Sequence, residues 1–396
     1  MNTASEPGGP SEAGWIPLSV PLIGGNAWTY VKQCLDTGWV SSAGEFVNRF
    51  EREVAHAAGR PHGVACTSGT AALHLALVAA GVQPGDEVLV PALTFAAPAN
   101  AVRYVGAWPV FVDVEADYWQ IDPQRVRDFV ERGCDWRDGA LINKTTGRRV
   151  SAVLPVDLLG HPVDIDPLVE IARSRELPVI EDATETLGAA YRGTPVGSKA
   201  DIACFSFNGN KVVTAGGGGV LVTAREDWAA RAKHLSTQAK VDPVEYVHDE
   251  IGFNYRLTNI QAALGVSQLE LLDDYVAAKR RIAARYSGAF ASVPGIRTMR
   301  EAPWAKSTFW LYTPLIDAAV YGEDSRALMR RLTSLRIQSR PLWQPLHRSP
   351  AHQASPAADA PVAERIAAAA LSLPSSVGLT ASEQDRVIEA VIARVR

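Results

Sequence analysis

Short apolar runs alternate with helical stretches between about residues 60 and 225, and this alternation constrains the fold more than any other feature of the chain. The runs are apolar on both faces, as expected of strands that lie between two layers of helices. Repeated strand–helix units predict an α/β domain with a mostly parallel, seven-stranded sheet. We expect its strands at residues 63–67, 87–91, 109–114, 151–157, 178–182, 201–207 and 219–223.

The pattern changes after residue 223. Residues 258–287 carry Leu, Ile and Ala at helical spacing, which predicts one long helix. We therefore expect a flexible tail at 1–14, a large domain at 15–257 and a smaller C-terminal α+β domain at 258–396. The Ala- and Pro-rich stretch 348–364 is expected to be an exposed loop.

Composition and charge exclude several classes of protein. The net charge of -4 leaves no general basic footprint, so we expect no nucleic-acid partner. No apolar run approaches the roughly 20 residues of a membrane span, and residues 1–14 lack the features of a signal peptide. The four cysteines are widely spaced and no H-E-x-x-H occurs, so we expect no metal centre, reduced thiols and a cytoplasmic location.

The segment F-S-F-N-G-N-K-V-V-T-A-G-G-G-G places Lys211 in a turn after an expected strand and before four glycines. A desolvated lysine amine can attack an aldehyde and form a Schiff base. The glycines allow the backbone to pass close to a bulky group. Taken alone, a solvated loop lysine is the commoner explanation. A phosphate-binding P-loop is excluded, because Val212 stands where that motif needs Ser or Thr.

Three other segments follow expected strands. T-S-G-T at 67–70 suits an anion at a helix N-terminus, although an ordinary N-cap is the commoner explanation when the segment is taken alone. Asp182, in E-D-A-T-E-T-L-G, could keep a pyridine nitrogen protonated or could cap the next helix. Phe95 could stack on a flat ring or belong to the core.

Together, the four segments supply a phosphate cradle, a carboxylate, an aromatic face and a lysine at one edge of one sheet. Ligands of open α/β sheets bind at that edge. These are the groups that pyridoxal 5'-phosphate (PLP) requires, so the sequence predicts a PLP site.

The chain also resembles a known family. S-G-T-A-A-L-H-L-A-L, V-P-A-L-T-F, E-D-A-T-E-T-L-G-A, F-S-F-N-G-N-K and G-F-N-Y-R-L-T-N-I-Q-A-A-L-G occur in this order. They are similar to motifs of the DegT/DnrJ/StrS sugar aminotransferases, and the resemblance extends from Trp15 to about His347. It implies PLP-dependent transferase fold type I, like aspartate aminotransferase. It also implies a homodimer whose two active sites are shared between the subunits.

The resemblance implies a role for individual residues around the cofactor. Lys211 is the Schiff-base lysine and Asp182 the partner of the pyridine nitrogen. Phe95 stacks on the ring, and Glu185 lies near the ring hydroxyl. The residues implied to hold the phosphate are Gly69, Thr70 and Ser206, with Asn254 reaching it from the neighbouring subunit. On the substrate side the resemblance implies Arg256, with Trp39 and Ser41 of W-V-S-S-A-G and His347 of P-L-W-Q-P-L-H.

The chain departs from many family members in the residues before the lysine, which here are Asn208, Gly209 and Asn210. This variant is similar to a subgroup that aminates carbon 4 of nucleotide-linked 4-keto-6-deoxy sugars on bacillosamine or legionaminic acid routes, with perosamine-type enzymes as close relatives. The resemblance thus implies amino transfer from glutamate to a 2-acetamido-4-keto-6-deoxyhexose, for surface polysaccharide. The alternatives are a carbon-3 sugar or cyclitol aminotransferase, and a PLP-binding sensor without turnover.

Overall fold

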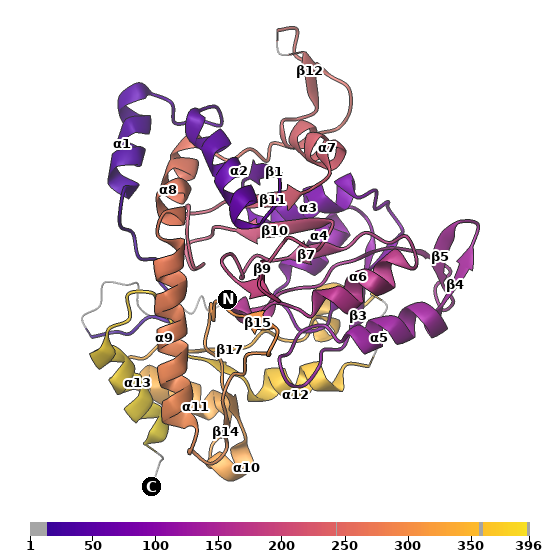
Figure 1. The fold of residues 1–396 in the computed structure, drawn as a ribbon. Helices are drawn as coiled ribbons and strands as arrows, with labels where there is room; N and C mark the ends of the chain where they lie inside the picture. Colours follow the sequence, from indigo (N-terminus) through magenta and orange to yellow (C-terminus); the bar gives the residue numbers. More distant parts are fainter. Residues whose placement is uncertain (1–13, 243, 356–358, 394–396) are drawn as a thin grey trace, which may run out of the picture.

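The computed structural model describes residues 14–242, 244–355 and 359–393. Its centre is a sheet in two hydrogen-bonded groups, one of four strands and one of five (Figure 1). One group has the order β1 (His62–Cys66), β11 (Gly219–Thr223), β10 (Ile202–Ser206) and β7 (Ile180–Asp182). The other has the order β3 (Trp108–Val112), β2 (Glu87–Pro91), β6 (Arg149–Val153), β5 (Ala140–Asn143) and β4 (Cys134–Arg137), the last two forming a hairpin at its edge. Parallel bridges from Val153 to Val179 and from Val156 to Asp182 join the two groups.

The sheet is mostly parallel, as the sequence predicts. β11 runs antiparallel to both its neighbours, β1 and β10, whereas β10 pairs with β7 in parallel and β2 pairs in parallel with β3 and β6. The carboxyl ends of the parallel strands therefore lie along one edge. The β6 strand ends at Val153, earlier than the expected Asp157, because beyond it the backbone makes only an isolated bridge.

Helices cover both faces of this sheet, and side chains alternate between them. On β10, Ile202 and Cys204 belong to the core beneath α3 (Gly69–Ala79), α4 (Ala97–Tyr104) and α7 (Glu226–Ser236). Ala203 and Phe205 point to the opposite core, which includes α2 (Glu45–Ala57) and α8 (Asn259–Leu269). This alternation explains why the strand is apolar throughout: both of its faces are buried.

The expectation of one long helix at 258–287 was wrong. The structure has α8 followed by α9 (Leu272–Phe290), which run down one side of the molecule (Figure 1). The backbone of Leu271 leaves the helical conformation between them, with φ -110° and ψ 6°. Glu270 at this break accepts hydrogen bonds from Asn26, Tyr30 and Arg49, which tie it to the N-terminal helices.

The stretch 348–364 is exposed at several described positions, as expected, but it is not an exposed loop throughout. His352 and Ala360 are buried, and α12 (Pro361–Ala369) begins inside the expected loop. The backbone N–H groups of Val362 and Ala363 donate to the Asp113 carboxylate, which caps this helix. Residues 356–358 of the stretch, and residues 1–13 of the expected tail, lie outside the described part of the chain.

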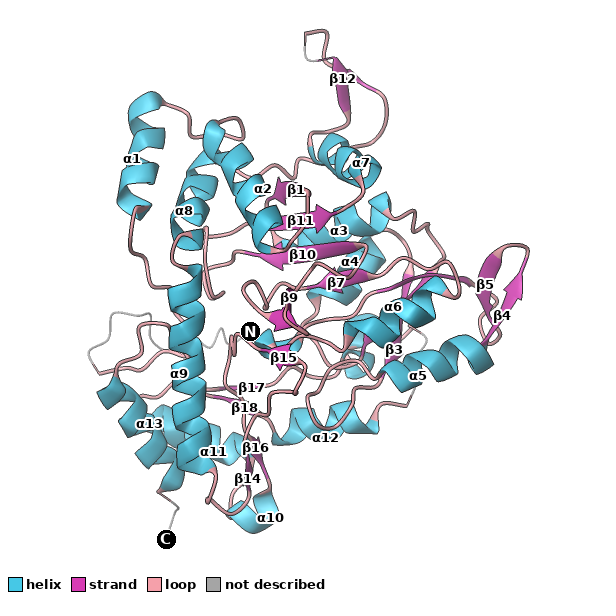
Figure 2. Ribbon diagram, viewed as in Figure 1, coloured by secondary structure: helices cyan, strands magenta, loops and turns pink. Residues whose placement is uncertain are grey.

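Several elements had no sequence prediction. They include α1 (Ala27–Thr37) beside α8 and two protruding hairpins, β4–β5 and β12–β13 (Figure 1). At the C-terminal end, α13 packs on α9 and α11 (Figure 2). The remaining bounds are α5 Pro123–Asp128, β4 Cys134–Arg137, β5 Ala140–Asn143, α6 Ile165–Arg173, β8 Ala190–Tyr191, β9 Thr194–Pro195, β12 Lys240–Asp242, β13 Val247–His248, β14 Ile296–Arg297, β15 Ala305–Lys306, β16 Leu315–Ile316, α10 Ala318–Tyr321, α11 Ser325–Ser334, β17 Arg340–Pro341, β18 Leu371–Ser372 and α13 Ala381–Ile392. Within the described residues, none of these helices combines the length and the apolar character needed to span a bilayer.

Candidate active site

A cavity of about 300 Å³ lies at the edge where the parallel strands end. It collects residues from the turns after β1, β2, β7 and β10, from the loop before β11, and from two distant segments near residues 310 and 343. Its lining is Thr67, Ser68, Gly69, Thr70, Phe95, Ala97, Thr184, Glu185, Ser206, Asn208, Asn210, Lys211, Gly217, Gly218, Trp310 and Trp343.

Lys211 lies in this cavity with its side chain only 13% exposed. Its backbone N–H donates to the Asn208 carbonyl and so closes the turn that follows β10. Its Nζ lies 3.6 Å from Oε1 of Glu185 and 4.1 Å from the centre of the Trp310 ring. The lysine is therefore enclosed between a carboxylate and an aromatic face, which excludes the solvated loop conformation.

Glu185 is buried beside this amine. Its Oε2 accepts a 2.7 Å hydrogen bond from the backbone N–H of Leu159. Burial raises the pKa of Glu185 to about 7, although the Lys211 charge and the Leu159 hydrogen bond lower it. The site therefore contains a carboxyl group that can gain or lose a proton near neutral pH.

Asp182 ends β7 and is 2% exposed. Its Oδ1 accepts a hydrogen bond from the Thr184 backbone N–H. Burial raises its pKa, while Thr184 and the Lys211 charge oppose that rise. The neighbouring Glu181 has a different partner: its Oε2 accepts from the backbone N–H of Gly197. Asp182 is thus a buried carboxylate whose charged form is favoured by the nearby Lys211 charge. It does not serve as an N-cap, because the element that follows β7 is a strand.

The first turn of α3 forms one wall of the cavity. The helix begins at Gly69 after the N-cap Ser68, whose Oγ accepts from the Ala71 backbone N–H. First-turn N–H groups have no acceptor within their own helix, and the helix dipole adds positive potential there. A Cβ at Gly69 would lie 2.9 Å from the Cβ of Ser206 and 3.1 Å from Cγ2 of Thr184. The close approach of these walls therefore requires glycine.

Three aromatic side chains form the opposite part of the cavity. Phe95 is 54% exposed and meets Trp343 edge-on at 5.9 Å between ring centres. Trp343 in turn stacks on Trp310 at 6.4 Å. Sequence reasoning did not find either tryptophan. Trp343 lies inside the P-L-W-Q-P-L-H segment that was singled out, but no signal distinguished it from its neighbours.

The predicted residues separate into two groups. Gly69, Thr70, Phe95, Glu185, Ser206 and Lys211 line the cavity, and Asp182 lies buried in the strand beside it. Trp39, Ser41, Asn254, Arg256 and His347 do not line it.

Each residue of the second group has other surroundings. Trp39 lines a different cavity together with Asn259, and the Ser41 carbonyl accepts from the Asn259 N–H. Asn254 is exposed, and the backbone of Arg256 forms an isolated antiparallel β-bridge with Cys66 of β1. Nε2 of His347 lies 2.8 Å from Oε1 of Glu364. The roles of these residues stay predictions.

A larger cavity, of about 540 Å³, lies among β14, β16 and α12. Its lining is mostly aliphatic, with Arg297, Arg365 and Asp317 at its rim, and it contains no lysine or cysteine among the described residues. The smaller cavity combines Lys211, Glu185 and the first turn of α3, so we take it as the candidate active site.

Comparison with known proteins agrees with this geometry. The model of the DegT/DnrJ/EryC1/StrS aminotransferase family matches residues 21–392. The chain belongs to this family. The resemblance inferred from the motifs is thereby confirmed, as are fold type I and the dependence on PLP. The protein is a PLP-dependent sugar-nucleotide aminotransferase, and the alternative of a sensor without turnover is set aside.

Three similar proteins show how far the likeness extends. A GDP-perosamine synthase from Caulobacter vibrioides is 40% identical over 378 residues, which are 95% of this chain and 97% of the relative. The structure of DesI in the presence of its TDP-sugar product has a TM-score of 0.85 and 30% identity, covering 96% of this chain and 93% of that one. The PLP form of the putative sugar aminotransferase Spr1654 from Streptococcus pneumoniae has a TM-score of 0.85 and 26% identity, covering 96% and 98%.

Proposed function

We propose that this aminotransferase moves the amino group of L-glutamate to carbon 4 of a nucleotide-linked 4-keto-6-deoxyhexose. The observation that carries the proposal is the enclosure of Lys211 between Glu185 and Trp310, in a cavity that also presents a helix N-terminus. Relatives that are 40% and 37% identical over 95% of the chain are GDP-perosamine synthases, and perosamine is a 4-amino sugar. The names of these relatives support amination at carbon 4 of the sugar over amination at carbon 3.

The cavity suits PLP on two grounds. Gly69 leaves room at the first turn of α3 that any larger residue would fill, and the N–H groups there favour a phosphate. Lys211 is the nucleophile that can bind the cofactor's aldehyde. We therefore assign the phosphate to Gly69, Thr70 and Ser206. The flat ring would lie against Phe95, and the pyridine nitrogen would face Asp182.

When bound, PLP supplies an electron sink for the carbon that carries the migrating nitrogen. The chain supplies the proton handling. Nζ of Lys211 takes the proton from that carbon in one half of the reaction and returns a proton to the sugar carbon in the other. The Asp182 carboxylate keeps a proton on the pyridine nitrogen, and Trp310 shields the lysine from water.

We also propose that the protein works as a homodimer with shared sites. The β12–β13 hairpin stands away from the molecule (Figure 1) and carries exposed apolar side chains, among them Val244 at 79% and Tyr246 at 68% exposure. Apolar side chains exposed together on one element mark a surface that binds another protein. Asn254 follows the hairpin and is exposed, which suits a residue that completes the site of a neighbouring subunit. Because all four cysteines are unpaired, a reducing cytoplasm is the proposed compartment.

A substrate panel tests the proposal. Purified enzyme with PLP and glutamate is offered UDP-, GDP- and dTDP-linked 4-keto-6-deoxy sugars, each with a 2-acetamido or a 2-hydroxyl group, and matched 3-keto sugars. We expect turnover of one 4-keto compound at least about tenfold above the best 3-keto compound, because discrimination by one misplaced carbonyl exceeds about 1.4 kcal/mol. Faster turnover of a 3-keto sugar or a cyclitol would reverse the assignment of carbon 4.

A further inference from the structure

Lys279 on α9 is an amine in the core of the protein, 2% exposed. Its Nζ donates hydrogen bonds to the carbonyl of Trp310 at 2.9 Å and to that of Ser375 at 2.6 Å. Among the described residues no carboxylate pairs with it, and burial alone lowers the pKa of Lys279 to about 7. Both hydrogen-bond acceptors are main-chain atoms.

Burial of an amine without an opposite charge lowers the stability of the folded protein. Neighbouring buried positions on this helix carry no charge. Val276, Ile282 and Ala283 are apolar and buried on the same helix. An aliphatic residue at position 279 would be less costly to bury, but it would leave two buried carbonyls without donors. The structural contribution specific to Lys279 is therefore the pair of hydrogen bonds that it donates to the main-chain carbonyls of Trp310 and Ser375.

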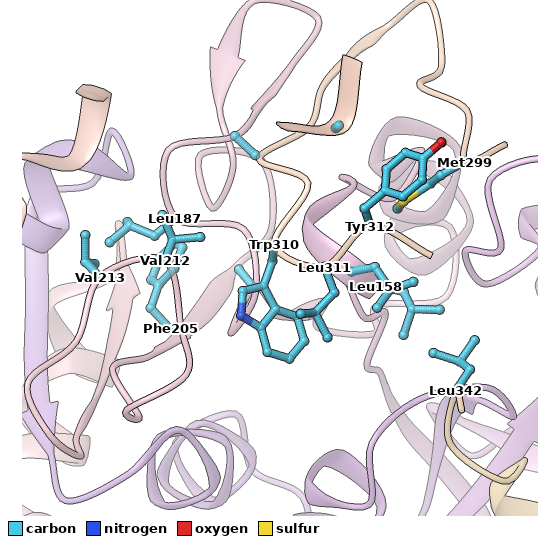
Figure 3. Packing of buried hydrophobic residues seen from close by; sticks show 14 of the residues in the cluster. Leu158, Leu187, Phe205, Val212, Val213, Met299, Trp310, Leu311, Tyr312 and Leu342 are labelled. Atoms are coloured by element: carbon cyan, nitrogen blue, oxygen red, sulfur yellow. The ribbon is translucent and has the colours of Figure 1, made fainter. Parts of the chain in front are cut away.

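Trp310 is held at both ends. Lys279 binds its carbonyl, and its own ring Nε1 donates to the carbonyl of Asn210 at 2.7 Å. Asn210 directly precedes Lys211, so the second contact fixes the ring against the lysine turn. Two residues earlier, the Thr308 N–H donates to Gly160 and its Oγ1 to the Glu185 carbonyl. Figure 3 shows Trp310, Leu311 and Tyr312 packed in the core near Leu158 and Leu342.

We propose that Lys279 is a positioning residue for transamination, which holds the Trp310 carbonyl and thereby keeps the Trp310 ring against Nζ of Lys211. The ring face attracts the cationic amine and closes it off from water. The inference rests on the proposed role of Lys211. Lys279 does not line the cavity, and of its two acceptors only Trp310 contacts Lys211, so the proposed effect passes through Trp310.

The experiment measures Lys211 in PLP-free protein as well as turnover. Lys279→Met keeps the length and apolar stem of the side chain but removes its donors. Trp310→Leu removes the ring, and a double variant combines both. Acylation of Lys211 by a small amine-reactive reagent at fixed pH, followed by peptide mass spectrometry, reports the reactivity of Nζ.

We expect Lys211 to be acylated at least about threefold faster in each single variant, because a cation–π contact is worth about that factor at an exposed site and more at an enclosed one such as this. The double variant should show no further increase, since both changes remove the same contact. Lys279→Met should lower kcat about tenfold with KM for glutamate within a factor of two, as expected for misplacement near the reacting atoms.

Tyr286→Phe is the matched control. Tyr286 is also fully buried on α9, and its hydroxyl donates to the Pro374 carbonyl, next to Ser375. This change removes a buried hydrogen bond from the same helix without touching Trp310. It should lower stability but leave acylation and kcat unchanged.

Equal effects of Tyr286→Phe and Lys279→Met, or additive effects in the double variant, would overturn the inference. If Lys279→Met does not fold, Lys279→Gln keeps one amide donor, and the same comparison with Trp310→Leu applies. A different result would contradict the proposed function: normal turnover by the Lys211→Ala variant would show that Lys211 is not needed for the reaction. If Lys211→Ala loses turnover but the effects of Lys279→Met and Trp310→Leu add in the double variant, only the role of Lys279 is rejected.

Discussion

Glu185 and Lys211 form a buried pair in which Oε1 and Nζ lie 3.6 Å apart. The lysine charge favours the carboxylate, but burial of Glu185 outweighs it and leaves the pKa of Glu185 at about 7. The pair is therefore not a fixed salt bridge: its charge changes near neutral pH. This behaviour has a consequence for stability that can be measured without substrate.

Glu185→Gln should flatten the pH dependence of stability. The pKa of Glu185 is about 7 in the folded protein and 4.5 ordinarily, so the unfolded chain loses its proton first as the pH rises. The native state then binds more protons, and the free energy of unfolding falls between about pH 4.5 and pH 7. Urea unfolding of PLP-free protein across this window should show a smaller fall in Glu185→Gln. The exposed Glu226 supplies the control, because Glu226→Gln should keep the wild-type slope; an unchanged slope in Glu185→Gln would argue against the raised pKa.

Lys211→Ala should abolish transamination and the visible absorbance of bound PLP. No other amine lines the cavity among the described residues, so nothing replaces the Schiff base. Lys211→Arg should fail equally, because a guanidinium stays protonated and cannot attack an aldehyde. Absorbance spectra and glutamate turnover check both variants. Near-native turnover in either would remove Lys211 from the mechanism.

Asp182→Asn should leave PLP bound but slow turnover at least about a hundredfold, the loss seen when one electrostatic stabiliser is removed. The amide has nearly the same size but carries no negative charge to keep the pyridine nitrogen protonated. Single-turnover kinetics with glutamate measure the step directly. A rate within a few-fold of wild type would mean that another carboxylate serves the ring.

Gly69→Ala should weaken PLP binding at least about tenfold, because the added Cβ meets Ser206 and Thr184 where the phosphate is expected. The control is Gly209→Ala in the lysine turn, where a Cβ would meet nothing within 4 Å. Titration of each PLP-free variant with PLP, followed by absorbance, gives the comparison. Equal affinities would place the phosphate elsewhere.

Mixing two inactive variants tests the shared site. Lys211→Ala lacks the nucleophile, and Asn254→Asp would place a carboxylate against the phosphate. If Asn254 acts across the interface, one site of a mixed dimer carries both defects and the other carries neither. Random reassortment of equal amounts should then restore about a quarter of the wild-type activity per site, since half the dimers are mixed. No recovery despite demonstrated subunit exchange would assign Asn254 to its own subunit.

The sequence by itself determined the edge of the sheet and what lies there. Gly69 and Lys211 follow strands and Asp182 ends one, the apolar runs of these strands are visible in the sequence, and parallel strands bring their carboxyl ends together. The ends of the strands alone place these residues at that edge, so local pattern was sufficient for their position, although side-chain contacts such as that of Lys211 with Glu185 are long-range. The same reasoning failed for the helix at 258–287, because its break depends on Glu270 meeting Asn26 and Arg49 far away in the chain.

Only the tertiary structure decided what closes the site. Trp310 and Trp343 lie in irregular segments, and such segments have no period that a sequence could reveal. Main-chain hydrogen bonds between remote residues hold them: Thr308 donates to Gly160, and Leu346 donates to Ala92. The role of Lys279 could not be predicted from the sequence either, because a lysine on a helix is normally expected to be exposed or in a surface ion pair. Its two carbonyl acceptors come within reach only when α9 packs against the chain at residues 310 and 375. Long-range packing places these groups, and no local propensity encodes it.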